Sequence, residues 1–321
     1  MTVFGFSAML TLFTTTKAFV GQTAVIQRNA LRSWRALGED CHIIVFGDEP
    51  GTGEVCREID ALHVPDVDVT SRGTPLLGCM FERAEKMAWH DRLCFVNADI
   101  IFLPDLLEAV SVLSEDQILF VGQRWDVLIE KEWDFGARDY AGALRRWVRE
   151  HGRLHRPNAM DYFVFRKGQR PQMRDFAVGR AGWDNWFLQA CLQRGMTVID
   201  ATDAISCIHQ AHNYGHIPGG KREAWFGPEA LRNRSRAFLW DPLASIGDAQ
   251  MRLTANRKVR PARQFKHLWR RLERSLARVG ALYATYRFLR RACFASALRI
   301  GRAYRRLRGV EPNPVNDPWS V

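Results

Sequence analysis

The first 125 residues alternate short apolar runs with segments whose apolar residues recur every three or four positions. Runs of the first kind are typical of buried strands, and segments of the second kind are typical of helices. Strands and helices that alternate along a chain form a mostly parallel sheet with helices on both faces, because each parallel connection must cross over the sheet. The predicted strands are 9–14, 42–46, 62–64, 93–96 and 118–122, and the predicted helices are 26–37, 53–59 and 77–87.

This pattern predicts an α/β, Rossmann-like fold, in which ligands bind in a crevice beyond the carboxyl ends of the strands. Asp105 follows the fourth strand and is expected to cap the next helix. After residue 125 the pattern is less regular and richer in Trp, Asp, His and Gly. We expect one domain over residues 1–255 and a separate tail over 256–321.

The tail carries the positive charge of the chain. Residues 257–308 hold seventeen Lys and Arg against one acid, Glu273, so this segment has a net charge of +16 and the rest of the chain −5. Its apolar residues recur at helical spacing and predict two amphipathic helices, over 265–279 and 282–307. Apolar faces flanked by arginines suit an anionic membrane surface, here through residues 261–308. Packing on this chain or on a partner protein is the alternative, and nucleic acid is not expected as a partner.

The cysteines and the first residues bear on the compartment. The seven cysteines are odd in number and show no C-x-x-C spacing, which favours a reducing environment. The first sixteen residues lack a basic start and a cleavage site, and they predict a core strand rather than a signal peptide. We therefore expect a cytoplasmic protein, peripheral on the inner face of the membrane.

The run VNADII, residues 96–101, places a carboxylate where a buried strand ends. A carboxylate at the ligand-binding edge suits a hard divalent cation, and such a cation suits a diphosphate. Asp99 is therefore a candidate ligand for Mn2+ or Mg2+ and for a nucleotide diphosphate. An acidic residue that only forms a turn is the alternative interpretation.

Later segments add a second group of candidates. In GWDNW the carboxylate of Asp184 lies between two tryptophans, which would exclude water, raise its pKa and suit it to act as a general base. An N-cap beside core tryptophans is the alternative. His209, His212 and His216 have spacings of three and four, but no cysteine pair or HExxH accompanies them to make a structural zinc site. Asp126 and Asp161, each next to an aromatic residue, are candidate acceptors for sugar hydroxyls, and Trp183 is a further candidate sugar contact. A structural role is the alternative for both aspartates.

Nine motifs in order resemble a known family. They are LFTTTKAF (12–19), IQRNALRSW (26–34), IIVFGD (43–48), GTPL (73–76), VNADII (96–101), VGQRWD (121–126), DYFVF (161–165), GWDNW (182–186) and HQAHNYGH (209–216). Together they resemble the nucleotide-diphospho-sugar glycosyltransferases of the GT-A fold, within a group similar to glycosyltransferase family 2. The resemblance covers roughly residues 9–220.

The resemblance implies a nucleotide-binding half at 1–125 and an acceptor or catalytic half at 126–255. It implies that VNADII stands in the place of the metal-binding DxD motif, with Asp99 as its last aspartate and Asn97 in the place of the first. It implies further that a late histidine, His212 first and His209 second, completes the metal site, and that Asp184 is the base. The implied nucleotide and phosphate contacts are Thr14, Thr15, Asp48, Gly73, Arg83, Lys86 and Asn97, although a solvated helix face is the alternative for Arg83 and Lys86.

Three functions fit these residues. The first is a glycosyltransferase that moves a sugar from a UDP- or GDP-sugar to a hydroxyl acceptor, a carbohydrate or a lipid-linked molecule, in the synthesis of surface polysaccharide, lipopolysaccharide or glycolipid. The second is a sugar-phosphate nucleotidyltransferase, which is disfavoured because the segment TTTKAFVGQ after the first strand holds a single glycine. The third is a membrane-associated binding protein with a degenerate nucleotide site, for which Asn97 is the best support.

Overall fold

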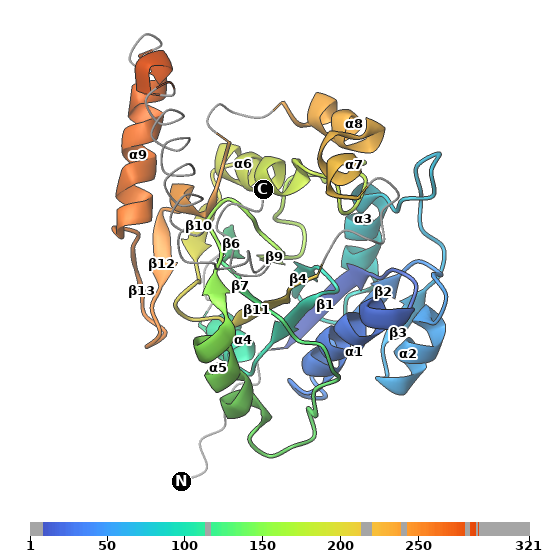
Figure 1. Cartoon of the computed structure of the whole chain (residues 1–321). Coiled ribbons are helices and arrows are strands. Elements are labelled where there is room, and N and C mark those ends of the chain that lie inside the picture. Colours follow the sequence, from blue (N-terminus) through green and yellow to red (C-terminus); the bar gives the residue numbers. More distant parts are fainter. Residues whose placement is uncertain are drawn as a thin grey trace, which may run out of the picture. The chain divides into compact units, whose positions relative to one another are not determined.

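The computed structural model of the chain describes residues 9–112, 117–212, 220–238, 243–279, 283–286 and 288. The chain divides into two compact units, residues 1–262 and residues 263–321. The first unit contains a nine-stranded sheet and a smaller four-stranded sheet (Figure 1). The large sheet has the spatial order β13 (Val259–Pro261), β12 (Met251–Leu253), β10 (Thr197–Asp200), β6 (Ile118–Val121), β9 (Tyr162–Arg166), β4 (Arg92–Val96), β1 (Leu10–Thr15), β2 (Cys41–Phe46) and β3 (Leu62–Val64).

The large sheet is mostly parallel, as the sequence predicted. Only β9 and β13 run antiparallel to their neighbours. The parallel strands have helical crossovers between them, and the antiparallel β9 places its first residue at the same edge as the carboxyl ends of β4 and β6. The helices of this unit are α1 (Gly21–Arg35), α2 (Thr52–Glu58), α3 (Leu77–Met87), α4 (Asp105–Ser111), α5 (Tyr140–His151), α6 (Trp183–Gln193), α7 (Gly220–Phe226) and α8 (Pro228–Ala237), with a 3-10 turn at Ile246–Asp248.

Helices cover both faces of the large sheet because its strands carry apolar side chains on both faces, and both sets have to be buried. Successive residues of β1 show this directly, since Leu12 packs in one hydrophobic core and Phe13 in the other. The first core includes apolar residues of α1, α2 and α4, and the second includes those of α3 and α6. Figure 1 shows α1 and α2 on one side of the strands and α3 and α6 on the other. The α/β fold class predicted from the alternation is therefore confirmed.

Three of the four strands of the small sheet lie within the part of the sequence that showed no regular pattern. Its order is β5 (Ile100–Phe102), β11 (Cys207–Gln210), β7 (Trp125–Val127) and β8 (Arg153–Leu154). Its apolar residues pack with α5 in a third core. Each strand has two to four residues, too few for period-two alternation to be recognised in the sequence.

Asp105 does not cap α4, contrary to the expectation from its position. It is the first helical residue, and the preceding Pro104 occupies the N-cap without a side-chain hydrogen bond. The Asp105 carboxylate instead accepts bonds from the Ser206 hydroxyl at 2.5 Å and from Arg145 at 3.2 Å. It therefore joins α4 to the segment before β11.

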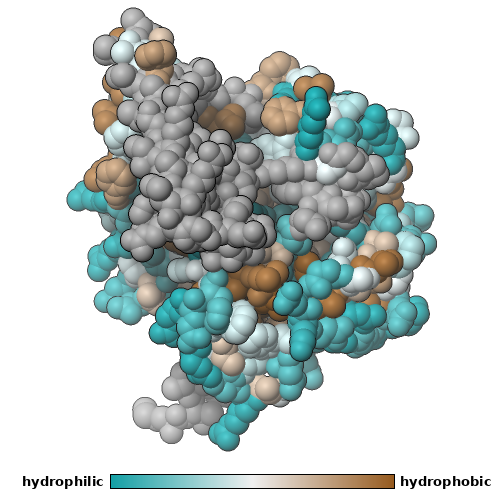
Figure 2. Space-filling view, in the orientation of Figure 1, coloured by the Kyte–Doolittle hydropathy of each residue, from teal (hydrophilic) through white to brown (hydrophobic). Residues whose placement is uncertain are grey.

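The second unit begins with the predicted amphipathic helix, α9 (Phe265–Ala277). Its apolar residues are exposed, with Phe265 at 80% and Leu268 at 50% of their full accessible area, whereas Arg270 and Glu273 are buried and paired at 2.6 Å. Figure 2 shows hydrophobic side chains along this helix at the upper left. Most of the second predicted amphipathic helix, 282–307, lies outside the described residues. Among the residues that the structure describes, no helix is long and apolar enough to cross a membrane.

Candidate metal and nucleotide-sugar site

Asp99 lies in the turn that joins β4 to β5, at the carboxyl edge of the large sheet. The turn is held from α1, where the Trp34 indole donates a hydrogen bond to the Ile100 carbonyl at 2.9 Å. Gln210 holds the same turn, because its backbone N–H donates to the Asp99 carbonyl at 3.1 Å. Oδ1 of Asp99 is buried and has no hydrogen-bond partner within the described part of the chain. A buried carboxylate oxygen without a donor is available to a cation.

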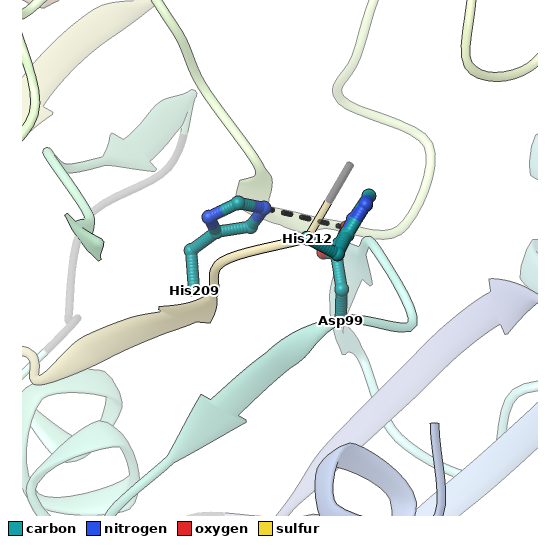
Figure 3. Close-up of side chains that lie close together, drawn as sticks. All are labelled: Asp99, His209 and His212. Atoms are coloured by element: carbon teal, nitrogen blue, oxygen red, sulfur yellow. Dashed lines mark hydrogen bonds and ion pairs between the residues drawn. The ribbon is translucent and has the colours of Figure 1, made fainter. Parts of the chain in front are cut away.

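Two histidines meet this carboxylate. Strand β11 pairs with β5 so that His209 stands opposite Ile100, next to Asp99 in the chain. Nε2 of His212 is 3.1 Å from Oδ2 of Asp99, and Nε2 of His209 is 3.6 Å from the same oxygen. Figure 3 shows the three side chains converging from the β4–β5 turn and from the end of β11. Their ligand atoms lie within 4.8 Å of one another, which allows one metal ion to bind all three.

The charges of this cluster are strongly coupled. Burial acts to raise the pKa of Asp99, but the His209 and His212 imidazoles outweigh burial and hold that pKa well below its usual range. Burial and Arg124 act to lower the pKa of His209, but the Asp99 and Asp126 carboxylates raise it overall. Asp99 is therefore ionised in the folded protein, as a metal ligand has to be. His216 lies outside the described residues.

Asn97 and the two predicted sugar-binding aspartates form one hydrogen-bonded network. Nδ2 of Asn97 donates to Oδ1 of Asp161 at 2.9 Å. Arg124 donates to both oxygens of Asp161, at 2.7 and 2.8 Å, and its Nε donates to Asp126 at 2.9 Å. The register explains this meeting, because β9 runs antiparallel beside β4 and brings Asp161 next to Asn97. Both carboxylates are thus occupied by protein donors, and their contact with a sugar stays a prediction.

The network also gives a physical reason for an amide rather than a carboxylate at position 97. An aspartate at position 97 would place two carboxylates at hydrogen-bond distance, which destabilises both charges. The amide at this position instead donates to Asp161 and leaves Asp99 as the single carboxylate of the cluster. Two imidazoles, from His209 and His212, complete the possible ligand set.

Asp184 lies in the first turn of α6, at the same edge of the sheet. Burial raises the pKa of its carboxyl to about 6, the Asp161 charge adds to the effect, and nearby backbone N–H groups oppose it. Such a value suits a general base near neutral pH. The N-cap of α6 is Gly182, with φ of 101°, so Asp184 is not the cap.

Trp183 is part of the core rather than of an open surface. Its side chain is 5% exposed, and its ring packs edge-on against Phe95 at 5.1 Å and Phe163 at 5.6 Å between centroids. This packing anchors the start of α6 and so positions Asp184. The predicted contact of Trp183 with a substrate is not tested by the structure.

Thr14, Thr15 and Asp48, which are expected to contact the nucleotide, lie at the same edge, at or just beyond the ends of β1 and β2. Thr14 and Thr15 end β1, and the Thr15 hydroxyl donates to the Phe46 carbonyl at the end of β2 at 2.8 Å. Asp48 lies just beyond β2 with an exposed side chain. Gly73 has φ of +79°, a left-handed conformation that favours glycine, in a turn closed on Thr70. Their binding of a nucleotide stays a prediction.

The structure does not bring Lys86 to this edge. Helix α3 starts there and runs away from it, so that Lys86, in its last turn, lies beside Lys167 and Gly168 beyond the far end of β9. Arg83 lies in the middle of α3, between the start of the helix at this edge and Lys86 in its last turn. Its guanidinium donates to the Asp66 carbonyl and stands over the Phe46 ring at 6.0 Å.

Four polar residues at the site had no role assigned from the sequence. Three of them, Arg124, Gln210 and Gln27, occur in the quoted motifs. Gln27 on α1 binds the backbone of Lys17 twice, with its Oε1 2.6 Å from the N–H and its Nε2 2.8 Å from the carbonyl. This holds Lys17 where its amine interacts with the charges of Asp99 and Arg180. His155 binds Asp126 at 2.6 Å but lies outside every motif, so no sequence signal identified it.

Comparisons with known proteins found similarity in solved structures alone. No family model matches the chain, and no curated protein matches it. A mannosyltransferase from Pyrobaculum calidifontis, solved with GDP-Man and Mn2+, is 14% identical over 94% of this chain and 81% of its own, with a TM-score of 0.43. A putative nucleotide-diphospho-sugar transferase from Desulfovibrio desulfuricans is 12% identical over 72% and 96%, with a TM-score of 0.40.

A third solved structure, glucosyl-3-phosphoglycerate synthase from Mycobacterium tuberculosis with Mg2+ and UDP, is 15% identical over 64% of this chain and 72% of its own, with a TM-score of 0.40. Likeness at these identities and TM-scores carries no conclusion about the function of this chain. The chemistry of this chain has to be argued from its own residues.

Proposed function

We propose that this protein is a GT-A, family 2-like glycosyltransferase that moves a sugar from a UDP- or GDP-sugar to a hydroxyl acceptor with inversion. The observation that carries the proposal is the cluster of Asp99, His209 and His212 at the carboxyl edge of the sheet, with Oδ1 of Asp99 buried and without a hydrogen-bond partner. A sheet of this kind binds its ligand at this edge. The carboxylate of Asp184, with a pKa of about 6, lies at the same edge.

The residues would divide the reaction between them. Asp99, His209 and His212 would hold a divalent cation, which when bound supplies positive charge to the diphosphate leaving group. Thr14, Thr15 and Asp48 would contact the nucleoside. Asp184 would accept the proton of the acceptor hydroxyl as the new glycosidic bond forms. Trp183 would keep α6 in place, because its ring is packed in the core.

The ligand set favours Mn2+ over Mg2+. Mg2+ prefers oxygen ligands in octahedral geometry, whereas imidazole nitrogen suits transition-metal ions. Two of the three possible ligands here are imidazoles. The preference follows from the residues of the cluster and needs no contact with the nucleotide.

The two other functions lose support. A nucleotidyltransferase needs a glycine-rich loop after the first strand. Here the segment after the first strand is tied to α1, because the side chain of Gln27 hydrogen-bonds the backbone of Lys17. Asn97 was the best support for a binding protein with a degenerate nucleotide site. Its amide has a structural role instead, because it donates a hydrogen bond to Asp161. The acceptor that we propose is a carbohydrate or lipid-linked molecule in the synthesis of surface polysaccharide, lipopolysaccharide or glycolipid.

Incubation with a panel of UDP- and GDP-sugars tests the proposal. We expect one donor to bind and to be hydrolysed slowly in the presence of Mn2+, with weaker activity in Mg2+ and none in EDTA. Release of the nucleoside diphosphate and a rise in the melting temperature are the measurements. A folded protein that neither binds nor hydrolyses any donor of the panel in Mn2+ would contradict the proposal.

We also propose that the second unit attaches the protein to an anionic membrane surface on the cytoplasmic side. Helix α9 exposes an apolar face that includes Phe265 and Trp269, at 80% and 43%. Arginines at 271 and 278 are exposed beside this face, and anionic head groups complement their charge. A membrane-bound enzyme would meet a lipid-linked acceptor directly.

Co-sedimentation with vesicles tests the attachment. We expect binding to phosphatidylglycerol-containing vesicles, loss of binding in high salt, and reduced binding of the double variant Phe265→Ser, Trp269→Ser. Trp89→Ser is the matched control, because Trp89 is 73% exposed on the first unit. Equal binding of the double variant and the wild type would show that α9 does not insert.

A further inference from the structure

His209 is held between two carboxylates that bind opposite sides of its ring. Its Nε2 is 3.6 Å from Oδ2 of Asp99, and its Nδ1 is 2.9 Å from Oδ1 of Asp126. The small sheet sets this arrangement through its backbone, because β11 pairs with β7 so that His209 stands directly opposite Asp126. The ring therefore has one nitrogen toward the candidate metal site and one toward Asp126.

Asp126 is itself fixed by other donors. Nε of Arg124 donates to its Oδ1 at 2.9 Å, and Nδ1 of His155 is 2.6 Å from its Oδ2. Arg124 also donates to both oxygens of Asp161, and Asn97 donates to the same carboxylate. Together with Nδ1 of His209, the Asp126 carboxylate thus has three donors on its two oxygens. It cannot rotate without breaking these hydrogen bonds.

An ionised carboxylate only accepts hydrogen bonds, so the ring nitrogen that faces it must carry the proton. When His209 is neutral and Nδ1 carries the proton, Nε2 holds the lone pair that binds a metal ion. A carboxylate behind a ligating histidine fixes its tautomer and orientation and makes the imidazole a stronger ligand. The 2.9 Å contact between Nδ1 of His209 and Oδ1 of Asp126 places a carboxylate behind the ring in this way.

We propose that Asp126 is a positioning residue that keeps His209 in the Nδ1–H tautomer and directs its Nε2 toward the cation held at Asp99. The proposal deepens the proposed function and rests on it for the cation. It replaces the expected contact of Asp126 with a sugar hydroxyl, because the oxygens of this carboxylate are already occupied by Arg124, His155 and His209.

The binding of Mn2+ without any donor sugar, measured by electron paramagnetic resonance, tests the proposal. Asp126→Ala should weaken Mn2+ binding by about 10- to 100-fold. Asp126→Asn should lose less, because its amide oxygen still accepts a bond from Nδ1. The matched control is Asp105→Asn, since Asp105 is a comparably buried, hydrogen-bonded carboxylate outside the cluster. It should leave Mn2+ binding unchanged even if it lowers the melting temperature.

Two further measurements separate positioning from a general loss of structure. In the background of His209→Ala, the change Asp126→Ala should have no further effect on Mn2+ affinity, because its action passes through the missing ring. Nitrogen NMR of the metal-free protein in mildly alkaline buffer should show His209 as the Nδ1–H tautomer in the wild type and a shift toward Nε2–H in Asp126→Ala. The spectrum of His209→Ala assigns the signal.

The proposal is wrong if the folded Asp126→Ala protein binds Mn2+ as the wild type does, or if its His209 keeps the Nδ1–H tautomer. Additive losses in the double variant would also contradict it. Failure of the wild type to bind Mn2+ would instead remove the cation from the proposed function, and the tautomer of His209 would still decide the role of Asp126.

Discussion

Replacing Asp184 by Asn is expected to lower the turnover number of sugar transfer by about 10²- to 10⁴-fold, the usual contribution of a general base. The amide has the shape of the carboxylate but does not accept the proton of the acceptor hydroxyl. Donor binding should be unchanged, because Asp184 is not among the candidate metal ligands. Single-turnover transfer and donor titration measure the two effects. Glu150→Gln, which removes an exposed carboxylate from α5, is the matched control.

The same variant should change how the protein depends on pH. With a pKa of about 6, the Asp184 carboxyl is protonated below that pH, so wild-type transfer should fall as pH decreases through about 6. The folded-state pKa is raised above the ordinary value, so this group stabilises the fold at acid pH and the stability is lost as pH rises through that range. Asp184→Asn should therefore be no less stable than the wild type at pH 7. Full transfer activity in this variant would assign the base elsewhere.

Replacing Asp99 by Asn is expected to weaken Mn2+ binding by about 100-fold or more, because it removes the negatively charged ligand of the cluster. This loss of affinity should exceed the loss that is typical when a residue behind a ligand is removed. Transfer should fall by a similar factor at saturating donor, because the developing charge on the diphosphate loses its counter-ion. Isothermal titration with Mn2+ and a coupled assay of nucleoside diphosphate release measure these effects.

Asp175→Asn is the control for Asp99, since it removes an exposed carboxylate from outside the cluster. It should bind Mn2+ like the wild type. Unchanged Mn2+ affinity in a folded Asp99→Asn protein would show that the cation, if one is needed, binds elsewhere. In that case the assignment of VNADII to the metal site would have to be abandoned.

The periodicity of apolar residues was enough to predict the main strands and helices. Each strand of the large sheet that was predicted, from 9–14 to 118–122, is present within a few residues of its expected bounds. Periodicity is a local property, because a strand buried on two faces needs consecutive apolar residues and a helix needs them on one side. The edge at which Asp99 emerges follows from the same reasoning.

Contacts between distant strands were not accessible in this way. The small sheet joins residues 100–102, 125–127, 153–154 and 207–210, which lie far apart in the sequence. Its pairing gives His209 a carboxylate on each side and brings His155, which has no motif, to Asp126. The expectation that Lys86 lies near a phosphate overlooked the direction of α3, which turns the last residues of that helix away from the edge.

The sequence by itself determined the α/β class, the position of Asp99 at the end of a buried strand and the basic, amphipathic character of the tail. These follow from composition and spacing within single segments. Only the tertiary structure decided that two histidines share the oxygen of Asp99, that Asn97 is a donor to Asp161, and that Asp184 is buried enough for its pKa to rise. Distances and burial arise when segments pack together, and the strand register that sets them here depends on pairings between segments far apart in the chain.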